Sequence, residues 1–303
     1  MSAVRFVACL AIGGSLLLPV AAPATESGHD MAFWISLKSH GFKVPAGSSA
    51  EALSLELLDM LLSTDPVRRD DIAYEAFAAW VHRDELLGPT ALEILRVRLV
   101  SMARVGLGDA EDDRVFGRSF AVLCLSVLAA EDLRKPFLTD SRYRELLALG
   151  LEALARERDL RGYVPGKGWA HATAHAADLL KFLARNPALK PADTAPMVEG
   201  IANRLRTAGQ VFVWGEDVRL AMALRSLIAR ADFDPAPIAQ WAARLQLDNK
   251  AVWSGDFEAS RYVAVRAQLN TLAQLAARLG SPAVDGNAAA VRNTLGGLFA
   301  NSD

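Results

Sequence analysis

Cysteine is almost absent from this chain of 303 residues, which contains only Cys9 and Cys124. Cys9 lies in an N-terminal segment that we predict to be cleaved, so the mature chain keeps one thiol and forms no internal disulfide. Cys124 lies in an apolar run, residues 120–128, that is typical of a buried helix. We interpret Cys124 as a small core residue, because a reactive thiol needs an exposed and electropositive environment.

Other features are scarce, and each scarcity excludes a class of protein. Aromatic residues make up 7% of the chain, and β-branched residues are also few, which favours helix. Beyond the N-terminal segment, no charge-free apolar run approaches the ~18 residues expected of a membrane span. No linker rich in Pro, Gly or Ser divides residues 25–303, so we expect a single all-helical domain.

The charges of the mature chain nearly balance. Removing Arg5 with the N-terminal segment leaves 32 of the 33 basic residues against 35 acidic ones. The resulting net charge of −3 provides no general attraction to nucleic acid or to an anionic membrane. We therefore expect no nucleic-acid partner.

The N-terminus has the three parts of a secretory signal peptide. A short basic region, residues 1–5, precedes the apolar residues 6–18, and the small residues Ala22 and Ala24 follow. We predict cleavage after Ala24, so that residues 1–24 are removed and the mature protein is periplasmic or secreted. The alternative is an N-terminal membrane anchor, but the apolar run is shorter than the ~20 residues that cross a bilayer.

The 3.6-residue periodicity of apolar side chains predicts an all-α protein of about twelve helices. Proline marks several of the helix starts, as in Asp65-Pro66 and Lys190-Pro191. No segment shows the sustained apolar–polar alternation that is typical of a strand. The predicted helices span residues 28–39, 49–63, 66–82, 89–104, 111–131, 139–157, 168–185, 191–208, 215–230, 235–247, 256–279 and 286–299.

Four of these helices begin alike, with an aromatic residue before a long apolar run. The aromatic residues are Phe116, Trp169, Trp214 and Trp253, which are spaced by 53, 45 and 39 residues. A loose period of this size is typical of two-helix solenoid units, so we predict stacked antiparallel helical hairpins in an α/α superhelix of the HEAT or armadillo kind. The alternative is an ordinary helical bundle whose helices start alike.

The segment 168–180 concentrates polar residues that could form a site. We predict that it opens a helix, on which His171, His175 and Asp178 share one stripe. Two imidazoles and a carboxylate at this spacing fit zinc or another divalent metal. The metalloprotease motif H-E-x-x-H is broken by Ala172, so zinc proteolysis is not supported. The alternative is that both histidines are structural and hydrogen-bonded to carbonyl groups or to an acidic neighbour.

In a superhelix the four similar helix starts lie side by side, which would join them into one concave pocket. The helix dipole disfavours arginine in a first turn, so we expect Arg118, Arg219 and Arg261 to meet acidic partners from neighbouring helix starts. Glu216 and Glu258 are, with the two histidines, the candidate catalytic acids or bases. An aromatic residue at a helix entry either staples the turn or floors the pocket. The predicted ligand-binding residues are Arg118, Trp169, His171, His175, Asp178, Trp214, Arg219 and Arg261.

The loop before this segment, residues 157–167, is also rich in charge. Glu157, Asp159 and Arg161 either support the histidines from behind or form a salt-bridged turn. The glycines of the loop do not have the spacing of a phosphate-binding loop. The chain contains no G-x-S-x-G motif, which leaves a serine hydrolase without support.

Three motifs follow one another along the chain. They are Phe116-Gly117-Arg118-Ser119-Phe120, Glu157-x-Asp159-x-Arg161-Gly162-Tyr163 and Gly168-Trp169-Ala170-His171-x-x-Ala174-His175-x-x-Asp178. Together with Thr64-Asp65-Pro66, Arg69-Asp70 and Ala73-Tyr74, they resemble a bacterial family catalogued as domain of unknown function 2785. The resemblance covers roughly residues 50–280. It implies an all-helical fold, and it assigns neither an activity nor a catalytic residue.

These observations lead to different hypotheses about function. The first is an exported binding module that recognises a small polar molecule or a peptide in a concave pocket around His171 and His175. The second is an envelope hydrolase or lyase that uses a histidine as acid or base, or a divalent metal such as zinc held by the same histidines and Asp178. The third is a purely structural scaffold. The sequence alone does not decide between binding and catalysis.

Overall fold

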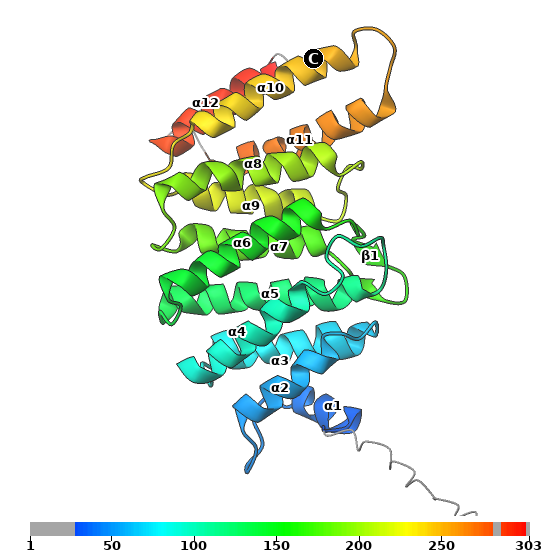
Figure 1. Ribbon diagram of the computed structural model, residues 1–303, viewed down its shortest axis with the longest axis vertical. Coiled ribbons are helices and arrows are strands. Elements are labelled where there is room, and N and C mark those ends of the chain that lie inside the picture. Colours follow the sequence, from blue (N-terminus) through cyan, green and yellow to red (C-terminus); the bar gives the residue numbers. More distant parts are fainter. Residues whose placement is uncertain (1–27, 281–285, 301–303) are drawn as a thin grey trace, which may run out of the picture.

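The structure, a computed structural model, describes residues 28–280 and 286–300. The predicted signal peptide, residues 1–24, lies outside the described residues. The described part is almost entirely helical, as the sequence predicts (Figure 1). Its α-helices are α1 (Met31–Ser39), α2 (Ala50–Met60), α3 (Glu75–Ala78), α4 (Pro89–Ala103), α5 (Arg114–Arg134), α6 (Asp140–Arg156), α7 (Ala172–Arg185), α8 (Pro191–Thr207), α9 (Glu216–Ile228), α10 (Ala236–Val252), α11 (Ala259–Arg278) and α12 (Asn287–Ala300).

Four short elements complete the predicted pattern or add to it. The π-helical segments η1 (Val67–Tyr74) and η2 (Ala79–Arg83) flank α3 and join it into the single helix predicted over 66–82. The strands β1 (Tyr163–Val164) and β2 (Gly168–Trp169) form a small antiparallel hairpin that the sequence did not predict. None of the helices in the described ranges combines the length and the apolarity needed to cross a bilayer.

All twelve predicted helices are present, and the start of α7 is the main difference. The sequence predicted a helix from residue 168, but β2 occupies residues 168–169 and α7 begins at Ala172. The backbone N–H of Ala170 donates to the carbonyl of Gly162 over 2.8 Å, which holds this part of the chain in the hairpin. His171, with a left-handed φ of 53°, then turns the chain into the helix.

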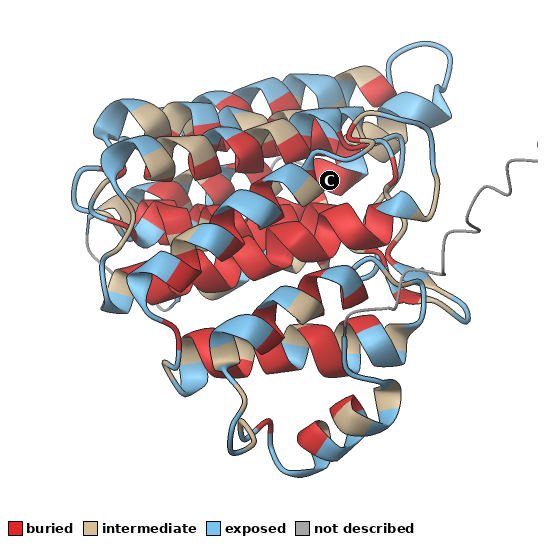
Figure 2. Ribbon diagram, turned by 60° about the horizontal axis from the view of Figure 1, so that its bottom comes forward, coloured by how far each residue is buried: buried red, intermediate tan, exposed pale blue. Residues whose placement is uncertain are grey.

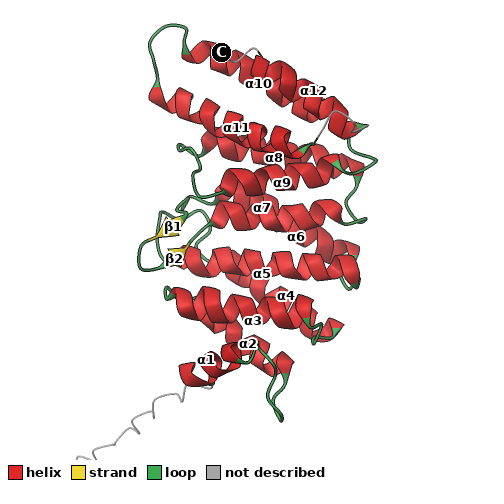
Figure 3. Cartoon of the chain, turned by 180° about the vertical axis from the view of Figure 1, so that it is seen from behind, coloured by secondary structure: helices red, strands yellow, loops and turns green. Residues whose placement is uncertain are grey.

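The helices stack in two layers along the long axis of the molecule (Figures 1 and 3). In one layer α5 packs against α7, α7 against α9 and α9 against α11. The other layer consists of α4, α6, α8 and α10. Here α8 packs on α6 and α10, while α4 and α6 pack across onto α5 and α7 of the first layer. The four helices that were grouped by their aromatic starts are therefore neighbours. This packing brings the starts of α5, α7 and α9 to the same end of their layer, beside the hairpin.

Helix α5 lies at the centre of the core. Every residue from 115 to 132 is buried, as expected of a helix that is surrounded by others, and Figure 2 shows buried residues concentrated on the central helices. Cys124 is fully buried, which confirms its interpretation as a core residue, and burial raises the pKa of its thiol. Because α5 also buries Arg118 and Ser119, the fold has to provide partners for these polar groups.

Candidate functional site

The β1–β2 hairpin is fixed to the rest of the fold by Arg69 of η1. The guanidinium of Arg69 is fully buried and lies 4.3 Å from the centroid of the Phe116 ring. Its Nη2 donates to the carbonyl of Lys167 over 2.7 Å, so a residue 98 positions earlier holds the hairpin tip. A Cβ at Gly168 would lie 2.8 Å from Pro66, and φ there is +77°, so this close approach requires glycine.

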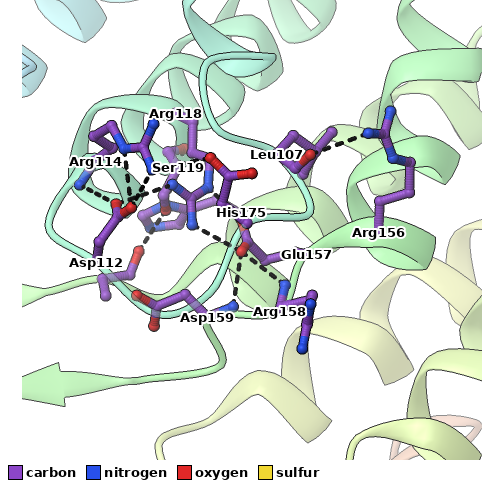
Figure 4. A network of polar contacts seen from close by, with 12 residues as sticks. Leu107, Asp112, Arg114, Arg118, Ser119, Arg156, Glu157, Arg158, Asp159 and His175 are labelled. Atoms are coloured by element: carbon purple, nitrogen blue, oxygen red, sulfur yellow. Dashed lines mark hydrogen bonds and ion pairs between the residues drawn. The ribbon is translucent and has the colours of Figure 1, made fainter.

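A buried ion pair joins the start of α5 to the end of α6. The Arg118 guanidinium donates to both carboxylate oxygens of Glu157, over 2.6 Å from Nε and 2.9 Å from Nη2 (Figure 4). The two side chains have exposed fractions of only 2% and 4%. Glu157 also accepts the backbone N–H groups of Arg158 and Asp159. Arg118 thus meets an acidic partner, but this partner lies at the end of α6 and not at a neighbouring helix start as the sequence predicted. The pair is bidentate, the geometry of the strongest ion pairs.

The loop after Glu157 is a salt-bridged turn, one of the two interpretations of the sequence. Asp159 is fully buried and accepts from Arg161 Nε over 2.9 Å. The Nη2 of Arg161 also donates to the carbonyl of Asp112 over 3.0 Å, which ties the turn to the residues just before α5. This turn supports His175 indirectly, because it fixes the start of α5.

His175 is buried and bonded to Ser119 in the second turn of α5. Its Nδ1 lies 2.7 Å from Ser119 Oγ, and the Ser119 hydroxyl donates to the carbonyl of Ala170. Since the single hydroxyl proton is used for Ala170, the proton between Ser119 and His175 belongs to Nδ1. Burial, with further contributions from His171 and Arg219, holds the pKa of His175 well below its usual range. His175 is therefore a neutral histidine that connects α7 to α5.

His171 connects α7 to α9. Its Nε2 lies 2.9 Å from the carbonyl oxygen of Trp214 and 3.6 Å from Glu216 Oε1, and its ring stacks on Trp169 at 4.7 Å. Burial lowers the pKa of His171 and raises that of Glu216. The Nε2–H of a neutral His171 donates to the Trp214 carbonyl. We call Arg118, Ser119, Glu157, His171 and His175 the hairpin corner.

The geometry gives no support to a metal site. Asp178 Oδ1 accepts from Lys181 over 2.8 Å and Oδ2 accepts from Arg219, so this carboxylate is engaged by two cations. His171 and His175 bond to the carbonyl of Trp214 and to Ser119 instead. In the part of the chain that the structure describes, no three His, Cys, Asp or Glu side chains come together in a way that could hold a metal ion.

The exposed tryptophans next to the corner pack on the hairpin. Trp169 and Trp214 are 38% and 49% exposed, and Tyr163 lies at the edge of the Trp169 ring with centroids 5.2 Å apart. A Cβ at Gly162 would lie 2.2 Å from Trp214 Cδ1, so the indole lies directly on the glycine backbone. This packing favours the interpretation that Trp169 and Trp214 staple the helix entries.

The start of α11 has its own contacts, separate from the corner. Arg261 pairs with Glu258 at 3.4 Å and donates to the carbonyl of Ala251, and both charged side chains are exposed. Trp253 packs with Phe257 at 6.0 Å. Glu258 and Arg261 thus make no hydrogen bond or ion pair with the two histidines among the described residues, and neither lines the groove described below.

A groove of about 520 Å³ lies one turn further along α7. Leu123 and Val127 of α5 and Phe182 of α7 form its apolar wall. Asp178 and Arg219, both predicted ligand-binding residues, line the groove, whereas the two histidines do not. We call it the α5–α7 groove. Its lining residues are Phe42, Tyr74, Glu75, Ala78, Ala79, His82, Arg83, Leu123, Ser126, Val127, Ala130, Asp178, Lys181, Phe182 and Arg219.

Sequence reasoning missed several residues of this groove. Tyr74 and Lys181 were not candidates, although they lie beside Asp178 and Arg219. Burial raises the pKa of Tyr74 to about 12, so its hydroxyl keeps its proton at neutral pH and can donate. Phe182 continues the helical stripe of His175 and Asp178 by one more turn, and this periodicity could have identified it.

The part of the chain that contains the hairpin corner matches a known family. A family model described as "Protein of unknown function (DUF2785)" matches residues 104–274, which is more than half of the chain. The chain belongs to this family. No match was found among curated proteins or among solved structures.

The family match confirms the resemblance over a shorter span than residues 50–280. It extends from the end of α4 into α11 and contains the hairpin corner and the α5, α7 and α9 residues of the groove. Tyr74 and the other residues of η1, α3 and η2 lie outside it. The family description assigns no activity, so the function has to be argued from the geometry.

Proposed function

We propose that this protein is a binding module and that the α5–α7 groove holds its ligand, a small molecule with a polar head. The observation that carries the proposal is the groove itself, in which an apolar wall lies next to Asp178, Lys181 and Arg219. A volume of about 520 Å³ is in the range of small-molecule sites, which combine apolar walls with a few placed polar groups.

The proposal moves the binding site away from His171 and His175, where the sequence placed it. Both histidines have lowered pKa values and are bonded to neighbouring helices, which suits a support better than an acid or base. The hydroxyl proton of Ser119 is committed to a carbonyl, which does not suit a nucleophile. We therefore favour binding over the hydrolase or lyase alternative.

Two further parts of the proposal concern architecture and location. The layered stack of α5, α7, α9 and α11 fits an armadillo-like helical repeat, in which one helix of each hairpin contributes to a shared binding surface. The basic, apolar and small-residue parts of residues 1–24 favour export, so we propose that the ligand is met in the periplasm or outside the cell.

Fluorescence titration with the neutral probe phenylnaphthylamine tests the proposal. Phe182→Glu places a charge on the half-buried apolar wall and should weaken binding by about tenfold or more. Leu247→Glu, on the 67% exposed side chain of a residue in α10, is the matched control and should leave the affinity unchanged. Equal affinities for wild type and a folded Phe182→Glu variant would overturn the assignment of the groove as the binding site.

A further inference from the structure

A single carboxylate in the α5–α7 groove forms ion pairs with two cationic side chains. Asp178 is 3% exposed and accepts from both Lys181 and Arg219. Among the described residues, neither Lys181 nor Arg219 pairs with a second carboxylate. The only other carboxylate among the residues that line the groove, Glu75, pairs with Lys38 at 3.4 Å, and Lys38 also pairs with Asp71 at 3.5 Å. The cluster of Asp178, Lys181 and Arg219 therefore has a surplus of one positive charge.

Both cations that share Asp178 lie close to the apolar wall. Lys181 is only 17% exposed, and its Nζ lies 4.5 Å from the centroid of the Phe182 ring. Arg219 is 47% exposed and lies at the open side, where it can turn toward a ligand. The Tyr74 hydroxyl lines the same region and keeps its proton. A ligand head placed here meets three donors, of which two are charged.

The remaining charged residues of the groove are already paired. Arg83 donates to Asp84 over 2.7 Å, and His82 lies 3.0 Å from Glu131. Neither pair changes the charge balance of the cluster of Asp178, Lys181 and Arg219. The excess of positive charge is thus local, and it is next to the residues that would contact an apolar ligand body.

We propose that the ligand is a small amphipathic anion, whose negatively charged head binds Lys181 and Arg219 and whose apolar body lies along the wall of Leu123, Val127 and Phe182. This inference rests on the proposed function and specifies its ligand class. A cationic head is disfavoured by repulsion, and a neutral head leaves the surplus charge unpaired. Carboxylate and phosphate heads share the chemistry that the groove selects.

Two probes with the same aromatic skeleton test the charge preference. Anilinonaphthalene sulfonate is anionic and phenylnaphthylamine is neutral, so their affinities separate the effect of the head from that of the apolar body. Arg219→Gln removes the surplus charge and should weaken sulfonate binding by about tenfold. Asp178→Asn raises the surplus and should strengthen it severalfold. Neither variant should change the affinity for the neutral probe more than about twofold.

The two variants are expected to change sulfonate affinity in opposite directions. Damage to the fold would instead weaken sulfonate binding in both variants, so it cannot imitate the expected result. Melting temperatures and circular dichroism establish that each variant is folded, and in the wild type the sulfonate affinity should also fall with added salt. Parallel changes for both probes, or weaker sulfonate binding by a folded Asp178→Asn variant, would overturn the anion preference. The groove assignment itself would survive that result, since it fails only if a folded Phe182→Glu variant keeps the wild-type affinity for the neutral probe.

Competition distinguishes the sources of the anionic head. Decanoate and decyl phosphate, each displacing the bound sulfonate probe, represent a carboxylate and a phosphate. Decanol has the same apolar chain without charge and should displace the probe at least about tenfold less effectively. Equal displacement by decanol and by both anions would contradict the inference.

Discussion

The hairpin corner and the α5–α7 groove lie next to each other on α5 and α7, but they differ in how their charged side chains are paired. In the corner, Arg118 and Glu157 are buried and matched one to one. In the groove, Asp178 is shared by Lys181 and Arg219. Matched and buried polar groups hold helices in place, whereas an unmatched charge near solvent is available to a ligand. The most recognisable motifs of this chain therefore belong to a structural support, and the proposed binding groove lies beside it.

Breaking the corner should have the largest effect on stability. Arg118→Ala leaves the Glu157 carboxylate buried without its partner, and we expect a loss of about 3–5 kcal/mol in the free energy of unfolding. Urea denaturation followed by circular dichroism measures this loss.

Arg114→Ala is the control on the same helix, since Arg114 is 53% exposed and pairs with Asp109 and Asp112 at the surface. Its unfolding midpoint should stay close to that of the wild type. If the two variants had equal midpoints, the buried pair would not be the structural element that we describe.

The burial of His175 should appear as a pH dependence of intermediate size. Its pKa is lowered in the folded state, so its contribution to stability is present above about pH 6.5 and is lost as the pH falls, by up to ~1.4 kcal/mol per unit. His175→Asn keeps a donor near Ser119 but cannot titrate. The stability gap between wild type and this variant should narrow between about pH 6.5 and 5.5.

The comparison with the variant is needed because other groups titrate with the opposite sign. Burial raises the pKa values of Glu216 and Asp70, whose contributions to stability decrease as the pH rises. These groups are shared by both proteins and cancel in the difference. A gap that is constant over this range would mean that His175 is not held neutral by burial.

The smallest effect on stability is expected in the groove. Arg219→Gln leaves Asp178 bonded to Lys181, and Arg219 itself is 47% exposed. The unfolding free energy should change by less than about 1 kcal/mol, as measured by urea denaturation. A loss as large as that of Arg118→Ala would show that the groove is built like the corner and would remove the contrast between the two regions.

The sequence predicted the helices well because their signals are local. Apolar periodicity and the prolines at positions 66 and 191 mark the helices and their starts. The aromatic helix starts also predicted which helices would be neighbours in one layer. The start of α7 was wrong because the hairpin depends on Arg69, which is distant in sequence and bonds to Lys167.

The site was predicted only in part, because exposure and pairing are properties of the packed structure. The sequence identified Asp178 and Arg219, which line the groove, but it could not show that His175 is turned into the core. Tyr74 comes from a helix more than 100 residues earlier than Asp178 and reaches the groove only through packing on α5. Residues that meet only in the folded protein leave no local pattern.

The affinity of the folded His175→Asn variant for anilinonaphthalene sulfonate tests the central claim most directly. If the hairpin corner is a support and the groove is the binding site, the dissociation constant of this variant should equal that of the wild type below the melting temperature of both. If His175→Asn lost the probe while remaining folded, and Arg219→Gln kept it, the binding site would lie at the histidines and the account would be contradicted.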